Sequence, residues 1–135
     1  INTSCTICSL WNLLTPRPTP WRLVFGHRPM ETQGRHRGMT WLEKVFIRST
    51  SAQLYCCGHN HLLEHYRFGG LDQITAGGGG SPLENDGVRS SGAAEFLHLN
   101  YGYVWVHFTR ETLDARFFDQ DGLEIYQFTR NQSEP

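Results

Sequence analysis

Short apolar runs alternate with polar, glycine-punctuated segments along the first half of the chain. Residues 21–26 hold a β-prone run that ends at a glycine, which predicts a strand buried on both faces. Thr40, with Glu43 three residues later, forms a capping box and predicts a helix over about residues 41–51. The run Leu54–Cys57 again ends at a glycine. This strand-helix-strand order favours parallel pairing through a right-handed crossover.

The pattern changes after the second strand. Residues 66–76 are strand-like, and a long polar loop that starts with four glycines extends to residue 94. Segments 101–109, 112–119 and 123–129 are rich in β-forming residues, with a hairpin signal at Asp121-Gly122. These segments predict an antiparallel meander, so the chain is expected to be an α/β protein. The predicted helix carries an apolar stripe made of Trp41, Leu42, Val45 and Phe46.

The length of 135 residues corresponds to one domain that can fold on hydrophobic burial alone. Residues 1–20 are interpreted as an arm that becomes proline-rich at its end, residues 21–130 as the domain, and residues 131–135 as a tail. The chain begins with Ile1 rather than methionine, which favours a fragment. The four cysteines match neither a zinc ribbon nor a dense disulfide framework, so buried or free thiols are expected.

The formal net charge of −1 provides no global attraction for nucleic acid or for an anionic membrane. No apolar stretch has the 18 or more residues of a membrane span, so neither a nucleic-acid nor a membrane partner is expected. Residues 22–48 hold six cations against two acids, whereas residues 111–134 hold six acids against two arginines. The first segment could attract an anionic ligand, or both segments could be ordinary solvated surface.

Histidines follow both predicted strands directly. His27 comes after Gly26, and Gly58 is followed by His59 and His61. Carboxyl ends of neighbouring parallel strands meet at one edge of a sheet, and residues i and i+2 of an extended segment project to the same side. Imidazole is the commonest metal ligand, so these histidines could reach a dinuclear centre. A hydrogen-bonded or surface histidine pair explains the H-x-H spacing equally simply.

Residues 24–29 (VFGHRP) and 55–61 (YCCGHNH) resemble the V-x-x-H and G-H-x-H motifs of calcineurin-like metallophosphoesterases. The resemblance is greatest to the purple, or tartrate-resistant, acid phosphatases. It extends over residues 21–130 and includes the intervening helix, the glycine-rich stretch 76–81 and the meander. It implies the C-terminal half of a metallophosphoesterase α/β sandwich, a strand-helix-strand unit followed by an antiparallel β-meander.

The resemblance implies roles for four histidines. His27 and His59 match ligands of the exchangeable divalent metal, and His61 matches a ligand of the ferric site. His36 matches a histidine that binds substrate phosphate or protonates the leaving group. The family hydrolyses phosphate monoesters with Fe and a second metal, Fe, Zn or Mn, about 3.5 to 4 Å apart.

Three further expectations accompany this likeness. A secreted or lysosomal location is favoured by the family and by the N-x-S/T sequons at Asn2 and Asn131. Arg28, Arg35 and Arg37 could attract phosphate or simply add solubility. His65, His98 and His107 match no ligand position and are expected to be structural or exposed.

Three motifs of the family, G-D-x-G, G-D-x-x-Y and G-N-H, do not occur in the 135 residues. They supply the carboxylates that hold two adjacent cations, so we expect a truncated phosphatase that lacks its N-terminal half. The isolated chain should be inactive or nearly so. Half of a layered sandwich should also expose strand edges and apolar faces.

Two alternatives remain open at the level of sequence. The chain could be a non-catalytic module for metal binding or protein interaction, with three histidines around one zinc ion. Alternatively, another chain could supply the missing carboxylates. Asp72 and Asp86 are the aspartates near the glycine-rich loop, and neither lies in a family motif.

Overall fold

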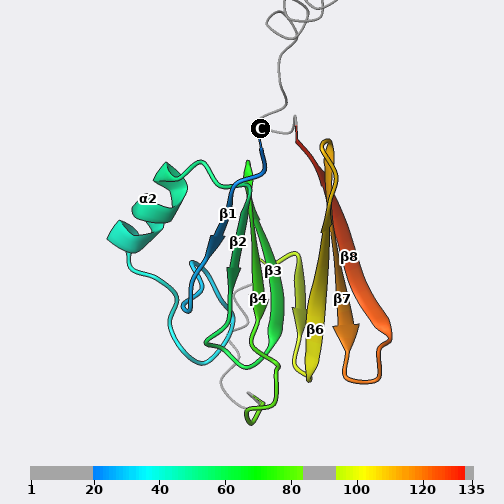
Figure 1. Cartoon of the computed structure of the whole chain (residues 1–135). Coiled ribbons are helices and arrows are strands. Elements are labelled where there is room, and N and C mark those ends of the chain that lie inside the picture. Colours follow the sequence, from blue (N-terminus) through cyan, green and yellow to red (C-terminus); the bar gives the residue numbers. More distant parts are fainter. Residues whose placement is uncertain (1–19, 84–93, 133–135) are drawn as a thin grey trace, which may run out of the picture.

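The computed structural model describes residues 20–83 and 94–132, and it consists of two β-sheets that face each other (Figure 1). Helix α2 lies against the outer side of the larger sheet. The arm predicted for residues 1–20 lies outside the described residues except for Pro20, and so do Cys5, Cys8 and Asp86. The last strand extends to Asn131, so the predicted tail begins later than expected.

The larger sheet has the strand order β1-β2-β4-β3-β5. Its strands are β1 (Leu23–Phe25), β2 (Leu54–Cys57), β3 (Leu63–Phe68), β4 (Leu71–Ala76) and β5 (Phe96–His98). β1 pairs in parallel with β2, as the strand-helix-strand order predicts, and β2 pairs in parallel with β4. β3 is antiparallel to both β4 and β5. The domain is thus a mixed α/β structure, as expected.

The prediction of one strand-like stretch over residues 66–76 is wrong. The region is a hairpin of β3 and β4, whose strands are joined at two glycines, and Gly69 adopts a positive φ of 60°. Glycine tolerates this conformation because it has no Cβ. The short strand β5 lies just after the predicted long loop and was not expected.

Helix α2 (Trp41–Ser49) begins where the capping box predicts. The Glu43 carboxylate accepts a 2.7 Å hydrogen bond from the backbone N–H of Thr40, and the hydrogen bonds from Thr40 hold the pKa of Glu43 below its usual value. The helix ends two residues before position 51, because the Thr50 hydroxyl donates to the carbonyl of Ile47 and Ser51 adopts a positive φ. None of the described helices is long and apolar enough to cross a membrane.

The smaller sheet is the predicted meander. It consists of β6 (Gly102–Phe108), β7 (Thr112–Asp119) and β8 (Glu124–Asn131), with antiparallel pairing throughout. The turn between β7 and β8 contains Gly122 at a φ of 81°, in agreement with the Asp-Gly hairpin signal.

The apolar faces of the two sheets meet in one cluster, which we call the inter-sheet core. Its members come from β2, β3 and β4 on one side and from β7 and β8 on the other: Leu54, Leu63, Ile74, Leu113, Ala115, Phe117 and Phe128. Inward-facing residues alternate with outward-facing ones along β7, as expected for a two-layer sandwich. Burial of these side chains therefore holds the sheets together.

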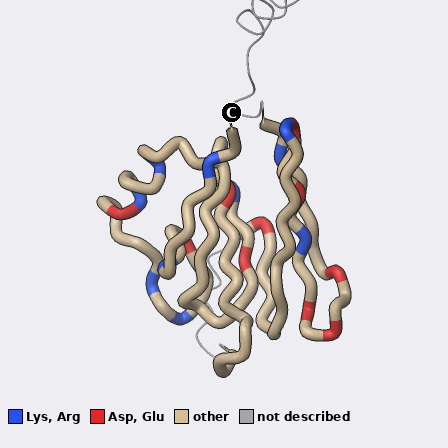
Figure 2. Tube along the Cα trace, in the orientation of Figure 1, with Lys and Arg blue, Asp and Glu red and all other residues tan. Residues whose placement is uncertain are grey.

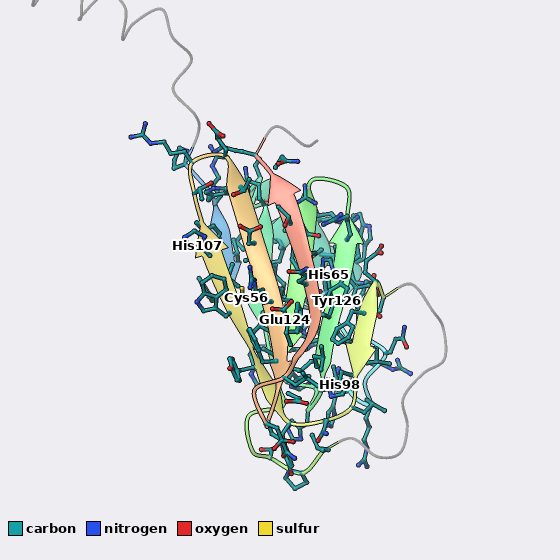
Figure 3. All side chains as sticks on the ribbon, turned by 90° about the vertical axis from the view of Figure 1, so that its right-hand side faces the viewer. Cys56, His65, His98, His107, Glu124 and Tyr126 are labelled. Carbon is teal, nitrogen blue, oxygen red and sulfur yellow. The ribbon has the colours of Figure 1, made fainter. Side chains whose placement is uncertain are left out.

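A polar network also crosses between the sheets. Asp72 of β4 is completely buried and accepts hydrogen bonds from Arg130 of β8 and, at 2.9 Å, from Arg67 of β3. The His65 ring lies between Asp72, at 2.8 Å, and the hydroxyl of Tyr126, at 2.9 Å, and Figure 3 shows His65 beside Tyr126. Burial alone would raise the pKa of Asp72, but these hydrogen bonds lower it. His65 is structural here, as expected.

A second apolar cluster lies between the larger sheet and α2, but it leaves most of the helix uncovered. Only Ile47 of α2 is buried, and the predicted apolar stripe faces solvent. We call the exposed apolar side chains at this edge of the domain the open face: Leu23, Phe25, Trp41, Leu42, Val45 and Phe46. The stripe of α2 lies on one side of the larger sheet, whereas Leu23 and Phe25 pair with Leu54 and Cys56 and lie on the other side. Among the described strands, β1 pairs only with β2. The expectation of an exposed strand edge and apolar face is confirmed.

Candidate functional site

His27 and His59 are brought together by the parallel pairing of β1 and β2. The backbone ladder continues past the strand ends, since Gly26 donates to Cys56 and Gly58 donates to the carbonyl of His27 at 3.1 Å. As a result, Nε2 of His27 and Nδ1 of His59 lie 3.0 Å apart. The sequence argument that adjacent strand ends present both histidines at one edge therefore agrees with the structure.

The segment that carries His59 and His61 is not extended, which corrects the sequence prediction. Hydrogen bonds from Asn60 to Gly58 and from Leu62 to Asn60 fold it into consecutive tight turns, and His59 adopts a φ of 72°. The Nδ1 atom of His61 lies 2.7 Å from the carbonyl oxygen of Pro82, so this ring is directed toward the segment after the four glycines.

All four histidines predicted for the site line one open hollow of about 490 Å³. His27, His36, His59 and His61 supply its polar side chains, together with Ser81, and small residues complete the lining: Gly58, Ala76, Gly77 and Gly79. The centre of the His36 ring lies 5.0 Å from that of His59. Because a neutral imidazole has one donor and one acceptor nitrogen, the hollow offers hydrogen-bonding groups of both kinds.

Backbone and side-chain hydrogen bonds hold the loop that carries His36 in place. Met39 donates to the carbonyl of Pro29 at 2.8 Å, which closes the loop at its base. Gln73 of β4 accepts hydrogen bonds from the backbone of Met30 and Glu31 and donates to the carbonyl of Glu31. The sequence analysis did not identify Gln73, because a polar residue within a strand gives no signal of the loop that it supports.

Gly26 leaves room for a side chain of the neighbouring strand. A Cβ at this position would lie 2.2 Å from the hydroxyl oxygen of Tyr55, so only glycine fits here. That hydroxyl donates a 2.6 Å hydrogen bond to the carbonyl of Arg28. Burial raises the pKa of Tyr55 to about 12, so the phenol remains protonated and holds the start of the loop.

Basic residues gather along the helix and on the loop that follows β1, whereas acids gather at the turn between β7 and β8 (Figure 2). Part of this positive charge is neutralised locally. Arg28 pairs with Glu43 at 3.2 Å and donates to the carbonyl of Gly38, and Lys44 pairs with Glu31. Arg28 therefore supports the loop and the helix, which reduces its availability for a phosphate.

The residues present do not fit a dinuclear metal centre. Within residues 20–83 and 94–132, no three His, Cys, Asp or Glu side chains are grouped to hold a metal ion. The described lining of the hollow contains no carboxylate, and Asp72 is engaged in the inter-sheet network. Burial raises the pKa of Cys56 to about 11 and that of Cys57 to about 12, so these free thiols stay protonated and are poor ligands.

Comparison with curated proteins finds plant phosphatases. Purple acid phosphatase 3 of Arabidopsis thaliana is 26% identical over 121 residues, covering 84% of this chain and 33% of the relative. Purple acid phosphatase 7 of the same plant is 29% identical over 114 residues, covering 79% of this chain and 34% of the relative. The chain thus spans about a third of the length of the curated relatives it matches. No family model matches.

Comparison with solved structures supports the fold. GAP50, described as the anchor in the inner membrane complex of Plasmodium, matches with a TM-score of 0.68 and 20% sequence identity. The match covers 82% of this chain and 36% of that protein. The two-sheet arrangement and the order of its elements therefore occur in a larger protein of known structure.

Proposed function

Since the chain has a calcineurin-like metallophosphoesterase fold and is similar to purple acid phosphatases, we propose that it carries half of a phosphate monoester hydrolase site. The observation that supports this proposal most is the hollow lined by His27, His36, His59 and His61. In this proposal residues 21–130 are the C-terminal half of a metallophosphoesterase domain.

The proposed roles follow the chemistry of imidazole. His27, His59 and His61 would hold metal through neutral ring nitrogens, and in the family these metals are Fe with Fe, Zn or Mn. His36 would bind the phosphate of a monoester or deliver a proton to the leaving group. Because two adjacent cations need carboxylate ligands and the described lining has none, we expect the isolated chain to be inactive or nearly so.

The open face indicates where the missing carboxylates would come from. β1 carries His27 at its end, and its outer edge offers backbone groups to a further strand. Phe25 is 75% exposed and Trp41 is 73% exposed, which is unusual for a solvent-facing surface. We therefore propose that a segment equivalent to the N-terminal half of a phosphoesterase packs here and brings acidic ligands to the histidines.

A non-catalytic alternative is favoured by one observation, the absence of carboxylates from the described lining. Three imidazoles can bind a single zinc ion and leave one coordination position open. His27, His59 and His61 would have to move closer together to do so, since they are not grouped to hold an ion in the described residues. In this alternative the chain binds one metal, or a protein partner, without hydrolysis.

A secreted or lysosomal location remains part of the proposal. Asn131 of the N-x-S sequon is exposed at the end of β8, where an oligosaccharyltransferase could reach it. Expression through a secretory pathway should give a mass increase that glycosidase removes and that Asn131→Gln reduces. The sequon at Asn2 lies outside the described residues.

Metal content by mass spectrometry, together with hydrolysis of an aryl phosphate at mildly acidic pH, tests the proposed function. The variant is His59→Ala/His61→Ala, and the control is His107→Ala on the outer face of the smaller sheet. We expect bound metal, but no more than one ion per chain, in the wild type and the control, less metal in the double variant, and no turnover. Two metals with turnover would overturn the prediction of an inactive chain, and no metal in any variant would overturn the metal role.

A further inference from the structure

The side chain of Asn60 lies between the two histidines of the G-H-N-H segment but does not line the hollow. It is completely buried and points under the loop that carries His36. Its Oδ1 accepts a 2.9 Å hydrogen bond from the backbone N–H of His36, and its Nδ2 donates at 3.0 Å to the carbonyl of His36. One amide thus binds both backbone polar groups of a single residue.

The remaining hydrogen of the Asn60 amide is also used. Nδ2 donates at 2.8 Å to the hydroxyl of Thr32, which itself donates to the buried carboxylate of Glu64 and accepts from the N–H of Gly34. Glu64 also accepts a hydrogen bond from the N–H of Gln33. A continuous series of polar contacts therefore holds the loop in place. It runs from Asn60 in the histidine segment through Thr32 of the loop to Glu64 of β3. In a buried hydrogen-bond network of this kind, removal of one side chain weakens the remaining hydrogen bonds as well.

The backbone around Asn60 leaves space for this arrangement and for little else. A Cβ at Gly34 would lie 2.4 Å from Cγ of Asn60, and a Cβ at Gly77 would lie 1.9 Å from the backbone oxygen of Asn60. Both distances are shorter than any allowed contact. The backbone approaches Asn60 most closely at Gly34 in the loop and at Gly77 after β4, where any larger residue would collide with it. The position of the Asn60 amide is therefore tightly defined.

We propose that Asn60 is a positioning residue that fixes His36 beside His59. Because Asn60 is next to His59 in the chain and holds the backbone of His36, the two imidazoles are set relative to each other by one buried side chain. The use of that position in phosphate binding rests on the proposed function. The position itself is a property of the apo chain and can be tested without metal or substrate.

The test is solution NMR on the full chain, with two measurements. The first is amide hydrogen exchange at His36, and the second is the nuclear Overhauser effect between the ring protons of His36 and His59. In Asn60→Ala we expect exchange at His36 to become about tenfold faster, because the backbone N–H of His36 loses its acceptor. We also expect the ring-to-ring effect to disappear. Retention of both signals at wild-type strength would overturn the proposal.

Gln73→Ala is the matched control, because Gln73 is equally buried and holds the other end of the same loop. It should accelerate exchange at Met30 and Glu31 and leave the contact between His36 and His59 intact. If Gln73→Ala removed that contact as completely as Asn60→Ala, the specific role of Asn60 would be contradicted, since any loosening of the loop would then suffice.

A second variant changes the loop instead of Asn60, and it tests the proposal even if Asn60→Ala does not fold. Gly34→Ala pushes a methyl group against the Asn60 amide and should also accelerate exchange at His36. An unchanged rate in Gly34→Ala would count against the proposal. If the NMR results hold and the metal experiment above fails, Asn60 still positions His36 and only the proposed function is lost.

Discussion

The inter-sheet core and the open face are built from similar residues but have opposite surroundings. Leu54 in the core is 1% exposed, whereas Leu42 in the open face is 71% exposed. The core is closed on both sides by β-sheet and is crossed by a buried ion network, while the open face has α2 and the edge strand β1 with nothing described against them. The difference teaches that apolar side chains are paired between the two sheets and are left in solvent at the edge formed by α2 and β1.

Removal of Arg130 should have the largest effect on the core. In Arg130→Ala the buried Asp72 carboxylate loses its partner from β8, and loss of one member of a buried pair costs about 3–5 kcal/mol. The measurement is the free energy of unfolding in urea. Arg116→Ala removes an exposed pair with Glu124 and should cost less than about 1 kcal/mol. If both variants lost the same free energy of unfolding, the buried network would stabilise the fold no more than the exposed ion pair does.

The same truncation in both regions compares them directly. Leu54→Ala should cost about 2–5 kcal/mol, because it opens a cavity in the inter-sheet core. Leu42→Ala should change the free energy of unfolding by less than about 0.5 kcal/mol, because the side chain is already in solvent. Thermal or urea unfolding of the two variants provides the measurement, and a large loss in Leu42→Ala would show that the open face is covered in solution.

Acid should weaken the two regions unequally. The pKa of Asp72 is lower in the folded chain than in the unfolded one, so its stabilising contribution is present above about pH 4 and is lost as the pH falls through the folded value. The pKa of Glu43 is lowered too, but this group is exposed at the helix start. We therefore expect Asp72→Asn to flatten the acid limb of a stability-against-pH curve more than Glu43→Gln does.

Charge on the open face should alter association and leave folding nearly unchanged. Leu42→Lys/Phe46→Lys replaces two exposed apolar side chains of α2, so we expect a smaller tendency to self-associate. Sedimentation velocity over a range of concentrations measures this tendency. Wild-type chain that stays monomeric at high concentration would contradict the idea that this surface needs a covering partner.

Local signals in the sequence were enough for much of the fold. The capping box at Thr40 and Glu43 fixed the start of α2, and the Asp-Gly turn fixed the hairpin of β7 and β8. The hairpin of β3 and β4 was missed although Gly69 and Gly70 stand in its turn, because the run on either side continues in β-forming residues. The strand β5 is three residues long and depends on pairing with β3, which no local pattern reveals.

The histidines of the hollow could be selected from the sequence, whereas the contacts that support them could not. The motifs selected His27, His36, His59 and His61, and these histidines line one hollow. The turns of the G-H-N-H segment and the buried amides of Asn60 and Gln73 depend on contacts with distant backbone, so spacing could not indicate them. The support of the hollow is therefore a tertiary property, whereas the histidine motifs are local in the sequence.

The left-handed conformation of His59 has a consequence for the stability of the whole chain. A non-glycine residue at a φ of 72° costs about 1–2 kcal/mol relative to ordinary helical or extended backbone, and asparagine bears this cost more easily than histidine. His59→Asn is therefore expected to unfold at an equal or higher urea concentration than the wild type. The backbone strain in this domain is thus located at one of the four imidazoles that line the hollow.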